Sequence, residues 1–226
     1  MSRVRFLEHK TLHAVGSFLR LDRFLVVYPK FKKDEVSSET VLVNVHRGDS
    51  VAGLLHLVRG TQQSLLLVEQ FRMPTLLDAD SGQPDMARIS KDPDAGRMIE
   101  LMAGMRRPGE PWLEAFRREC VEETDLDPDE TQYISSYYPS PGACSEQIHL
   151  YYGRIDWPAD KAWPETDDLE SAGFGDDSED IRRHFVTPDA FLDMVSKGEL
   201  NDGKCLVAAE WMRRPENAKL FELKTD

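Results

Sequence analysis

The sequence predicts an α/β fold, with helices on both sides of a mixed β-sheet and a small antiparallel β subdomain at the N-terminus. Strand-like apolar runs fill the first third of the chain, a regularly spaced helix begins near residue 111, and strands and helices share the remainder. This order of elements is typical of a layered α/β domain. With 226 residues and a hydrophobic content of 40%, the chain can bury one substantial core.

Apolar runs predict the strands. Residues 17–28 (SFLRLDRFLVVY) and 40–45 (TVLVNV) mix β-branched and other apolar side chains, and we expect them to form the N-terminal subdomain. The strands predicted for the main sheet are residues 51–58, 64–69, 132–138 and 148–155. Within the second of these, the unbroken stretch LLLV is typical of a strand that is buried on both faces.

Three helices are predicted, at residues 111–124, 188–197 and 204–213. A proline at position 111 suits a first helical turn. The apolar stripe that we expect this helix to pack on the core consists of Trp112, Leu113, Phe116, Cys120 and Val121. The polar segments 75–98 and 160–180 are predicted to be loops, and the second is strongly acidic.

Charge and composition limit the classes of partner and location. The net charge is −13 and the isoelectric point is near 4.9, so neither nucleic acid nor an anionic membrane is expected as a main partner. Cys120, Cys144 and Cys205 lack any paired spacing and indicate reduced thiols in a cytoplasmic protein. We expect no signal peptide in the charged N-terminus and no membrane span, since no run of about eighteen apolar residues occurs.

The stretch GMRRPGEPWLEAFRRECVEETDL, from Gly104 to Leu126, concentrates carboxylates around an arginine. Glu122 and Glu123 follow Glu119 by three and four residues, which places all three near one face of a helix. Like charges at this spacing repel each other, and a divalent cation would turn the repulsion into binding. Mg²⁺ prefers carboxylate oxygens and commonly shares its coordination shell with substrate phosphates.

The spacing resembles the signature of the Nudix hydrolases, G-x5-E-x7-R-E-U-x-E-E-x-G-U, in which U is a bulky aliphatic residue. The positions that match are Gly104, Glu110, Arg118, Glu119, Glu122, Glu123 and Leu126. Cys120 stands at a U position, and Asp125 replaces the second glycine, which would lie just past the helix in a left-handed conformation. Aspartate tolerates that conformation better than most residues, so the change concerns the helix end more than the chemistry.

Segments outside the signature are similar to the ADP-ribose pyrophosphatase branch of nucleoside-diphosphate-sugar hydrolases. They are VEQFR (68–72), IELMAG (99–104), SPGACSEQIHLYY (140–152), GFGDDSEDI (173–181) and DGKCLVAAEWM (202–212). The resemblance implies a Nudix-type α/β/α sandwich. It also implies a β subdomain at residues 1–48, a hydrolase domain at 49–215 and a charged C-terminal tail at 216–226.

The resemblance assigns roles to residues of the signature. The backbone carbonyl of Ala103, with Glu119 and Glu123, would coordinate Mg²⁺, and Glu122 would share a further ion. Arg118 would hold the helix carboxylates in place by charge-assisted hydrogen bonds. The number of ions, and whether Mn²⁺ replaces Mg²⁺, stay open.

The resemblance also implies substrate contacts and a catalytic base. Arg72 would contact the diphosphate or the terminal sugar, Glu146 the ribose or a water-linked metal, and Phe18 would stack on the base. Their plainer alternatives are a salt-bridged surface arginine, a surface charge at a strand end and a core aromatic residue. Asp177 aligns with the family's catalytic glutamate but is one methylene shorter, so Glu179 is the alternative base that would deprotonate the attacking water.

The resemblance therefore implies Mg²⁺-dependent hydrolysis of a nucleoside diphosphate sugar, with conversion of ADP-ribose to AMP and ribose 5-phosphate as the first expectation. Hydrolysis of GDP-mannose or a UDP-sugar, and a non-catalytic nucleotide-sugar sensor, are the alternatives. A homodimer is expected, with the N-terminal strands exchanged or packed across the two-fold axis. The segment 75–98 would cover the active site, change the accepted sugar, or be a disordered surface insertion.

Overall fold

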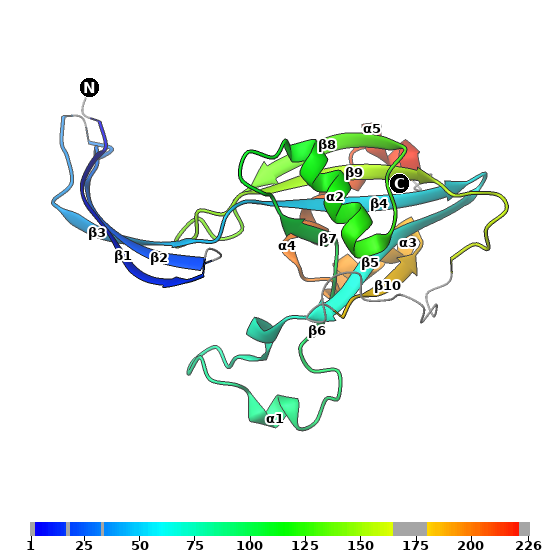
Figure 1. The fold of residues 1–226 in the computed structure, drawn as a ribbon, viewed down its shortest axis with the longest axis horizontal. Helices are drawn as coiled ribbons and strands as arrows, with labels where there is room; N and C mark the ends of the chain where they lie inside the picture. Colours follow the sequence, from blue (N-terminus) through cyan, green and yellow to red (C-terminus); the bar gives the residue numbers. More distant parts are fainter. Residues whose placement is uncertain (1–2, 17–18, 33, 165–179, 222–226) are drawn as a thin grey trace. The chain divides into compact units, whose positions relative to one another are not determined.

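The computed structural model describes residues 3–16, 19–32, 34–164 and 180–221 (Figure 1). The chain forms two compact units. One unit consists of Met1–Ser50 with Ser136–His149, and the other of Val51–Ser135 with Leu150–Asp226. In the ranges that the structure describes, no helix is long and apolar enough to cross a membrane.

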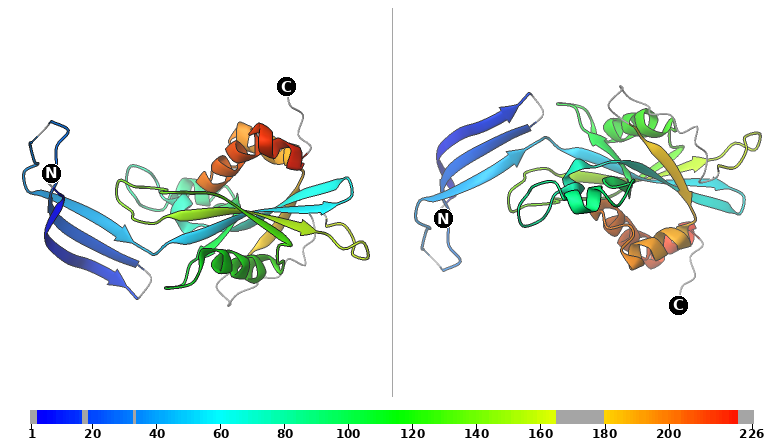
Figure 2. Two further views of the ribbon diagram at one scale, coloured as in Figure 1. Left: turned by 90° about the horizontal axis from the view of Figure 1, so that it is seen from above. Right: turned by 90° about the horizontal axis from the view of Figure 1, so that it is seen from below.

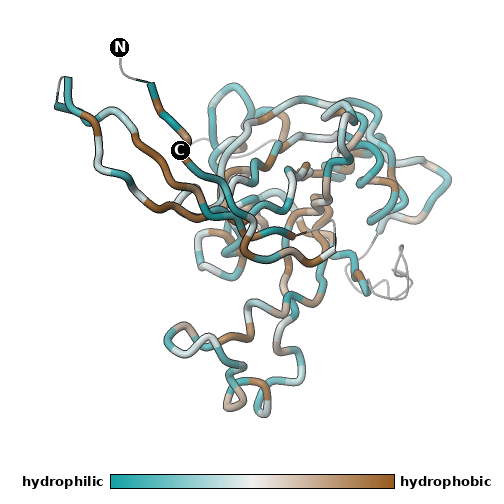
Figure 3. Tube along the Cα trace, turned by 60° about the vertical axis from the view of Figure 1, so that its left-hand side comes forward, coloured by the Kyte–Doolittle hydropathy of each residue, from teal (hydrophilic) through white to brown (hydrophobic). Residues whose placement is uncertain are grey.

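The first unit is built on a three-stranded antiparallel sheet in the order β1-β2-β3, as the sequence predicts. Its strands are β1 (Arg5–Val15), β2 (Leu19–Val27) and β3 (Thr40–His46). The predicted strands correspond to β2 and β3, whereas β1 was not predicted because it mixes charged and apolar residues and is exposed along its whole length. Hydrophobic residues recur along these strands (Figure 3).

A distant segment completes this unit. The backbone N–H of Val45 donates to the carbonyl of Ala143 at 2.7 Å, and Val45 and Cys144 form a parallel bridge. The N–H of Ser50 donates in the same way to the carbonyl of Gln147. No local pattern predicts this pairing, because its partners, such as Val45 and Ala143, lie far apart along the chain.

The second unit contains a seven-stranded sheet. Five of its strands follow the order β10-β5-β4-β9-β8, and the other two are β6, which pairs with β5, and β7, which pairs with β4. Its strands are β4 (Ser50–Arg59), β5 (Gln62–Phe71), β6 (Arg97–Glu100), β7 (Met102–Met105), β8 (Glu130–Tyr137), β9 (Ile148–Asp156) and β10 (Arg182–Val186). The predicted two-sided burial of β5 is confirmed, since Leu65 to Val68 are fully buried.

Helices cover both faces of this sheet (Figure 2). One face carries α2 (Trp112–Thr124), and the other carries α3 (Pro188–Lys197), α4 (Gly203–Met212) and α5 (Pro215–Ala218). The predicted α/β/α sandwich is therefore confirmed. The start of the expected charged tail is structured, because α5 continues into the 3-10 helix η2 (Lys219–Phe221) and Phe221 is buried.

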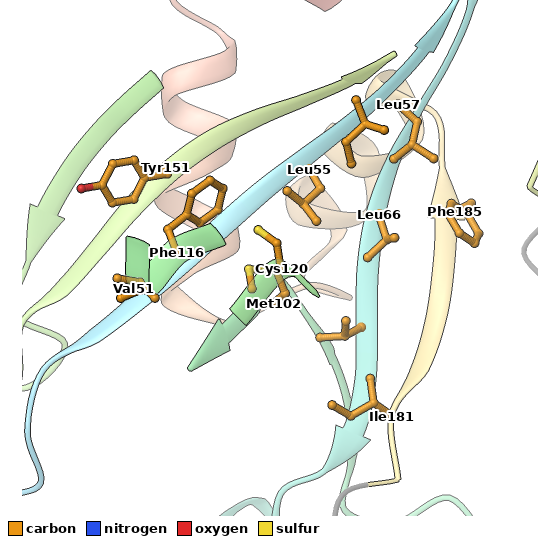
Figure 4. Close-up of a cluster of buried hydrophobic side chains, with 13 residues drawn as sticks. Val51, Leu55, Leu57, Leu66, Met102, Phe116, Cys120, Tyr151, Ile181 and Phe185 are labelled. Atoms are coloured by element: carbon orange, nitrogen blue, oxygen red, sulfur yellow. The ribbon is translucent and has the colours of Figure 1, made fainter. Parts of the chain in front are cut away.

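The core below α2 joins the helix to the sheet (Figure 4). Phe116 and Cys120 are fully buried in one cluster with Leu55 and Met102. On β4, a Cβ atom at Gly53 would lie 2.6 Å from the Phe116 ring, so glycine allows the helix to approach the strand closely.

Two residues of the predicted apolar stripe are not core. Leu113 is 41% exposed and Val121 is 45% exposed. The buried side of α2 instead includes Ala115, Glu119 and Glu123, because the helix turns two of its glutamates, not only its apolar residues, toward β7. The expectation that all five apolar residues pack in the core is therefore wrong for these two.

The segment between β5 and β6 is an arm with its own hydrogen bonds (Figure 1). It contains η1 (Met73–Leu76) and α1 (Met86–Ile89), and the side chain of Asp85 caps α1 by accepting from the N–H of Arg88. Leu77 and Pro84 form an antiparallel bridge within it. The alternative of a disordered surface insertion is therefore wrong for this segment.

Candidate active site

The helix α2 begins and ends as its sequence requires. Pro111 is the N-cap residue in an extended conformation, and helical geometry begins at Trp112. At the other end, Asp125 has φ 57° and ψ 27°, the left-handed conformation expected where the signature has glycine. The prediction that aspartate is accommodated at this helix end is confirmed.

Arg118 lies at the centre of the carboxylate cluster. Its Nε donates to Glu110 Oε1 at 2.8 Å, and its Nη2 donates to Glu110 Oε2 at 3.0 Å and to the carbonyl of Met105 at 2.9 Å. Its Nη1 donates to Glu119 Oε1 at 2.6 Å and to Glu122 Oε2 at 2.7 Å. These bonds engage all the N–H groups that a guanidinium offers, so Arg118 is a clamp for the cluster and not a ligand for substrate.

The clamp shifts the pKa values of its members in opposite directions. Hydrogen bonds from Arg118 lower the pKa of Glu110 to about 2. The same carboxylates raise the pKa of Arg118 above its ordinary value, chiefly through Glu110. Burial raises the pKa of Glu119 despite the bond from Arg118, because an anion loses hydration there. A nearby cation would favour the charged form of Glu119.

The strand β7 receives the two buried glutamates of α2. A Cβ atom at Gly104 would lie 1.9 Å from the carboxyl carbon of Glu119, so the missing side chain makes the space that this carboxylate fills. The N–H of Ala103 donates to Glu123 Oε2 at 3.3 Å. The structure thus brings together Ala103, Glu119 and Glu123, as the resemblance implied, and the first glycine of the signature has a steric reason.

These groups suit a hard divalent cation that is only partly ligated by protein. Glu119 and Glu123 are each 8% exposed, and the Ala103 carbonyl belongs to the same strand end. Among the residues that the structure describes, no three His, Cys, Asp or Glu side chains gather closely enough to hold a metal ion by themselves. Backbone carbonyl, water and phosphate oxygens would complete the shell, which is the usual arrangement for Mg²⁺.

The cluster carries an excess of negative charge. Four carboxylates face two guanidinium groups: Glu110, Glu119, Glu122 and Glu123 with Arg107 and Arg118. Glu122 is half-exposed and accepts from both Arg107 and Arg118. Its outward position fits the role of sharing a further ion, because it can reach ligands that the buried pair cannot.

Arg72 follows the last residue of β5 and is salt-bridged, as its plainer alternative supposed. Its Nε donates to Glu100 Oε1 at 2.6 Å, and the arginine side chain is 38% exposed. The partner Glu100 is buried and also accepts from Lys204 Nζ at 2.7 Å. Sequence reasoning missed Glu100 and Lys204, because 104 residues separate them.

Glu146 belongs to the first unit and is buried. Ser50 Oγ donates to Glu146 Oε1 at 2.6 Å, and Arg47 Nη1 lies 3.5 Å from Glu146 Oε2. The alternative of a surface charge at a strand end is therefore wrong. An ion pair and a hydroxyl donor hold this carboxylate in place, and its predicted substrate contact stays a prediction.

Three predicted site residues, Phe18, Asp177 and Glu179, lie outside the described residues. The chain after the acidic segment is described from Asp180, whose Oδ2 is 3.2 Å from Arg97 Nη2. Ile181 is buried in the core under α2. Residues directly following the predicted base are thus anchored in the same unit as the carboxylate cluster.

A carboxylate-rich helix clamped by one arginine against a glycine-containing strand, on an α/β/α sandwich, defines the class of metal-dependent hydrolases with this scaffold. Residues 49–208 match the NUDIX domain. The chain therefore belongs to the Nudix family, and the predicted resemblance is confirmed.

Relatives within the family are similar at modest identity. GDP-mannose pyrophosphatase of Enterobacter sp. (strain 638) is 29% identical over 167 residues, 74% of either chain. ADP-ribose pyrophosphatase of Escherichia coli (strain K12) is 29% identical over 116 residues, 51% of this chain and 52% of the relative. A crystal structure of an ADP compounds hydrolase shares the fold, with a TM-score of 0.60, 13% identity and coverage of 96% of this chain and 98% of the other.

Proposed function

We propose that this protein hydrolyses the pyrophosphate bond of a nucleoside diphosphate sugar in a Mg²⁺-dependent reaction, with ADP-ribose as the first substrate. The products would be AMP and ribose 5-phosphate. The observation that carries the proposal is the pair of buried glutamates at β7: Arg118 holds Glu119 in the space beside Gly104, and the N–H of Ala103 holds Glu123. The enzyme class, a Nudix pyrophosphohydrolase, agrees with the family and with the pyrophosphatase relatives.

GDP-mannose is the second candidate substrate. One observation favours it: the GDP-mannose pyrophosphatase relatives align over a longer part of the chain than the ADP-ribose pyrophosphatases do. Both substrates present the same diphosphate to the carboxylate cluster and differ in base and sugar. A direct comparison of the two substrates therefore decides between them without affecting the proposed chemistry.

The residues of the chain divide the work of the reaction. Mg²⁺, when bound, would neutralise the diphosphate and lower the pKa of the attacking water. Glu119, Glu123 and the Ala103 carbonyl would hold it, and Mn²⁺ would fit the same oxygen ligands. Arg118 keeps the carboxylates in position, so that the site needs little rearrangement when substrate enters.

The proton from the attacking water would pass to a carboxylate of the acidic segment. Asp177 and Glu179 are the two candidates, and separate variants distinguish them. Asp177→Asn and Glu179→Gln are compared under identical conditions. The residue that acts as base should lower kcat by roughly 10²–10⁴-fold when replaced, and the other should leave kcat within a few-fold of wild type.

A homodimer and a cytoplasmic location complete the proposal. The first unit exposes large apolar side chains on its sheet, including Phe6, Leu12, Val41 and Val43. Exposed apolar side chains that gather on a surface are typical of protein–protein contacts, and a second copy of the chain is the proposed partner. Light scattering coupled to size exclusion should give twice the monomer mass, and a monomer at all concentrations would contradict the dimer.

The function is tested with a panel of ADP-ribose, ADP-glucose, GDP-mannose, UDP-glucose and NADH in Mg²⁺, with products resolved by chromatography. Release of AMP and ribose 5-phosphate from ADP-ribose, lost in Glu123→Gln, is the expected result. Preference for GDP-mannose would move the protein to the second candidate. Tight binding of one compound without turnover of any would leave a nucleotide-sugar sensor and overturn the enzyme.

A further inference from the structure

A network of four charges, with the buried pair Glu100 and Lys204 at its centre, lies beside the active-site strand. Lys204 Nζ is 2.7 Å from Glu100 Oε2 and 3.0 Å from Asp202 Oδ1, while Glu100 Oε1 accepts from Arg72 Nε at 2.6 Å. Two cations and two anions alternate along this chain of contacts. Glu100 ends β6, and only Leu101 separates it from the strand that presents Ala103 and Gly104.

Burial of Glu100 and Lys204 carries a desolvation cost that the contacts within the network must offset. Glu100 is 3% exposed and Lys204 is 7% exposed. Charges that deep are strongly unfavourable unless each is paired and hydrogen-bonded. Lys204 also occupies the first turn of α4, where the helix dipole disfavours a cation. Burial lowers its pKa, but attraction to Glu100 and Asp202 outweighs that effect and raises the pKa, so Lys204 stays charged.

Hydrogen bonds hold the backbone of Arg72 as well as its Nε. Its N–H donates to the carbonyl of Gly96 at 2.7 Å, and its carbonyl accepts from Thr75 N at 3.0 Å and from Thr75 Oγ1 at 2.8 Å. Arg72 and Gly96 thus close the neck of the arm between β5 and β6. The Arg72 side chain is 38% exposed, and the atom that donates to Glu100 is its Nε.

We propose that Glu100 and Lys204 are positioning residues, which hold Arg72 so that the Nη edge of its guanidinium binds a phosphate group of the substrate. Glu100 occupies the Nε edge, and the Nη edge retains the planar fork that binds phosphate oxygens in pairs. Because Glu100 is paired with both Lys204 and Arg72, its single negative charge does not fully neutralise Arg72. The arginine can therefore still attract an anion. This inference rests on the proposed function.

A double-mutant cycle tests the proposal with ADP-ribose as substrate. Glu100→Gln should raise KM about tenfold while kcat changes less than threefold, because Glu100 acts by holding the arginine that binds substrate; the size is at the low end of the effect of outer-shell partners at metal sites, about 10–100-fold. Arg72→Ala should raise KM by at least as much. In the Arg72→Ala background, Glu100→Gln should then change KM less than twofold, since its effect passes through the arginine.

Variants of the lysine separate positioning from folding. Lys204→Met should raise KM as Glu100→Gln does, and Lys204→Arg should restore it to within about threefold of wild type. Lys197→Met, which removes an exposed lysine paired with Asp193 on α3, is the matched control and should leave KM unchanged. If Lys204→Met fails to fold, the cycle of Arg72 and Glu100 still decides the question.

Additive effects of Arg72→Ala and Glu100→Gln on KM, or an unchanged KM in folded Glu100→Gln, would overturn the positioning role while leaving hydrolysis intact. A wild-type protein that hydrolyses no member of the panel would instead overturn the proposed function, and this inference with it. The two failures are therefore distinguishable in one set of assays.

Discussion

Two arginine clusters in the second unit use the same residue types for opposite purposes. Arg118 contacts three carboxylates and a backbone carbonyl with its whole guanidinium, and its side chain is 17% exposed. Arg72 uses its Nε for one carboxylate, which a lysine shares, and its side chain is 38% exposed. In the first cluster negative charge is in excess, and in the second the charges balance.

The difference shows how the net charge of a cluster and the number of its free N–H donors determine which ligand it favours. A cluster with surplus carboxylates and no spare N–H groups attracts a cation. In the balanced cluster, the partly exposed arginine is proposed to bind an anion. Under the proposed function, the first cluster would bind the metal ion and the second a phosphate, which are the two components of a metal-bound diphosphate.

The largest effect is expected from removing one cation ligand. Glu119→Gln keeps the shape of the side chain and an oxygen that accepts from Arg118, but it removes the negative charge. We expect kcat to fall by about 10²–10³-fold, in line with the loss of one group that stabilises the transition state. Thermal stability should not fall, because burial already disfavours the charged form of Glu119.

The matched control is Glu114→Gln, an exposed position in the first turn of the same helix. It should retain wild-type kcat. Equal losses in the two variants would mean that the charge of α2 as a whole, and not the buried pair, determines activity.

A third polar site, around His56, is expected to make the stability of the protein depend on pH. The buried ring of His56 lies 2.9 Å from the Tyr152 hydroxyl and 3.0 Å from Gln63 Oε1, and burial lowers its pKa from 6.5 to about 4. Between these pH values the unfolded chain takes up a proton that the folded chain does not. Stability should therefore be complete above pH 6.5 and fall by about 3 kcal/mol as the pH decreases to 4.

Urea unfolding at several pH values measures this loss. His56→Gln should flatten the dependence between pH 6.5 and 4. Glu110, whose pKa is about 2, stays ionised in that range and keeps its bond to Arg118. An unchanged slope in His56→Gln would show that other groups titrate there.

An intermediate effect is expected at the clamp. Arg118→Lys keeps the charge but loses the planar fork that binds Glu110 in two places. We expect kcat to fall by about 10–100-fold, the range typical of residues that orient metal ligands. The decisive readout is the Mg²⁺ concentration for half-maximal activity, which should rise, whereas an unchanged value would contradict the clamp.

The smallest effect is expected at the helix end. Asp125→Gly restores the glycine of the signature at a residue with φ 57°. Relief of the left-handed conformation should stabilise the protein by about 1 kcal/mol and leave kcat unchanged. A large change in kcat would mean that Asp125 has a role in the chemistry.

Contacts between residues close together in the sequence could be predicted, whereas contacts between distant residues could not. The Arg118 clamp was predictable because Glu110, Glu119 and Glu122 lie within eight residues of it on one helix and its lead-in. The Arg72 network was not, since Lys204 reaches Glu100 across 104 residues. Burial of Glu146 depends in the same way on Ser50, 96 residues away.

The alternation of apolar and polar residues also failed to predict structure where the element is not buried. The strand β1 is exposed along its length and lacks the alternation that reveals a strand. Leu113 and Val121 look like core residues but lie on exposed sides of α2, because Glu119 and Glu123 occupy part of its buried side. The two buried glutamates thus interrupt the apolar pattern of the helix, and this interruption points to the candidate site.

Cation binding by the α2 cluster is measured most directly by titration with Mn²⁺, a paramagnetic substitute for Mg²⁺, followed by electron paramagnetic resonance. Wild type and Glu114→Gln should bind Mn²⁺ with the same affinity, and Glu119→Gln and Glu123→Gln should bind at least about tenfold more weakly. Equal binding by all four proteins would contradict the assignment of this cluster as the metal site.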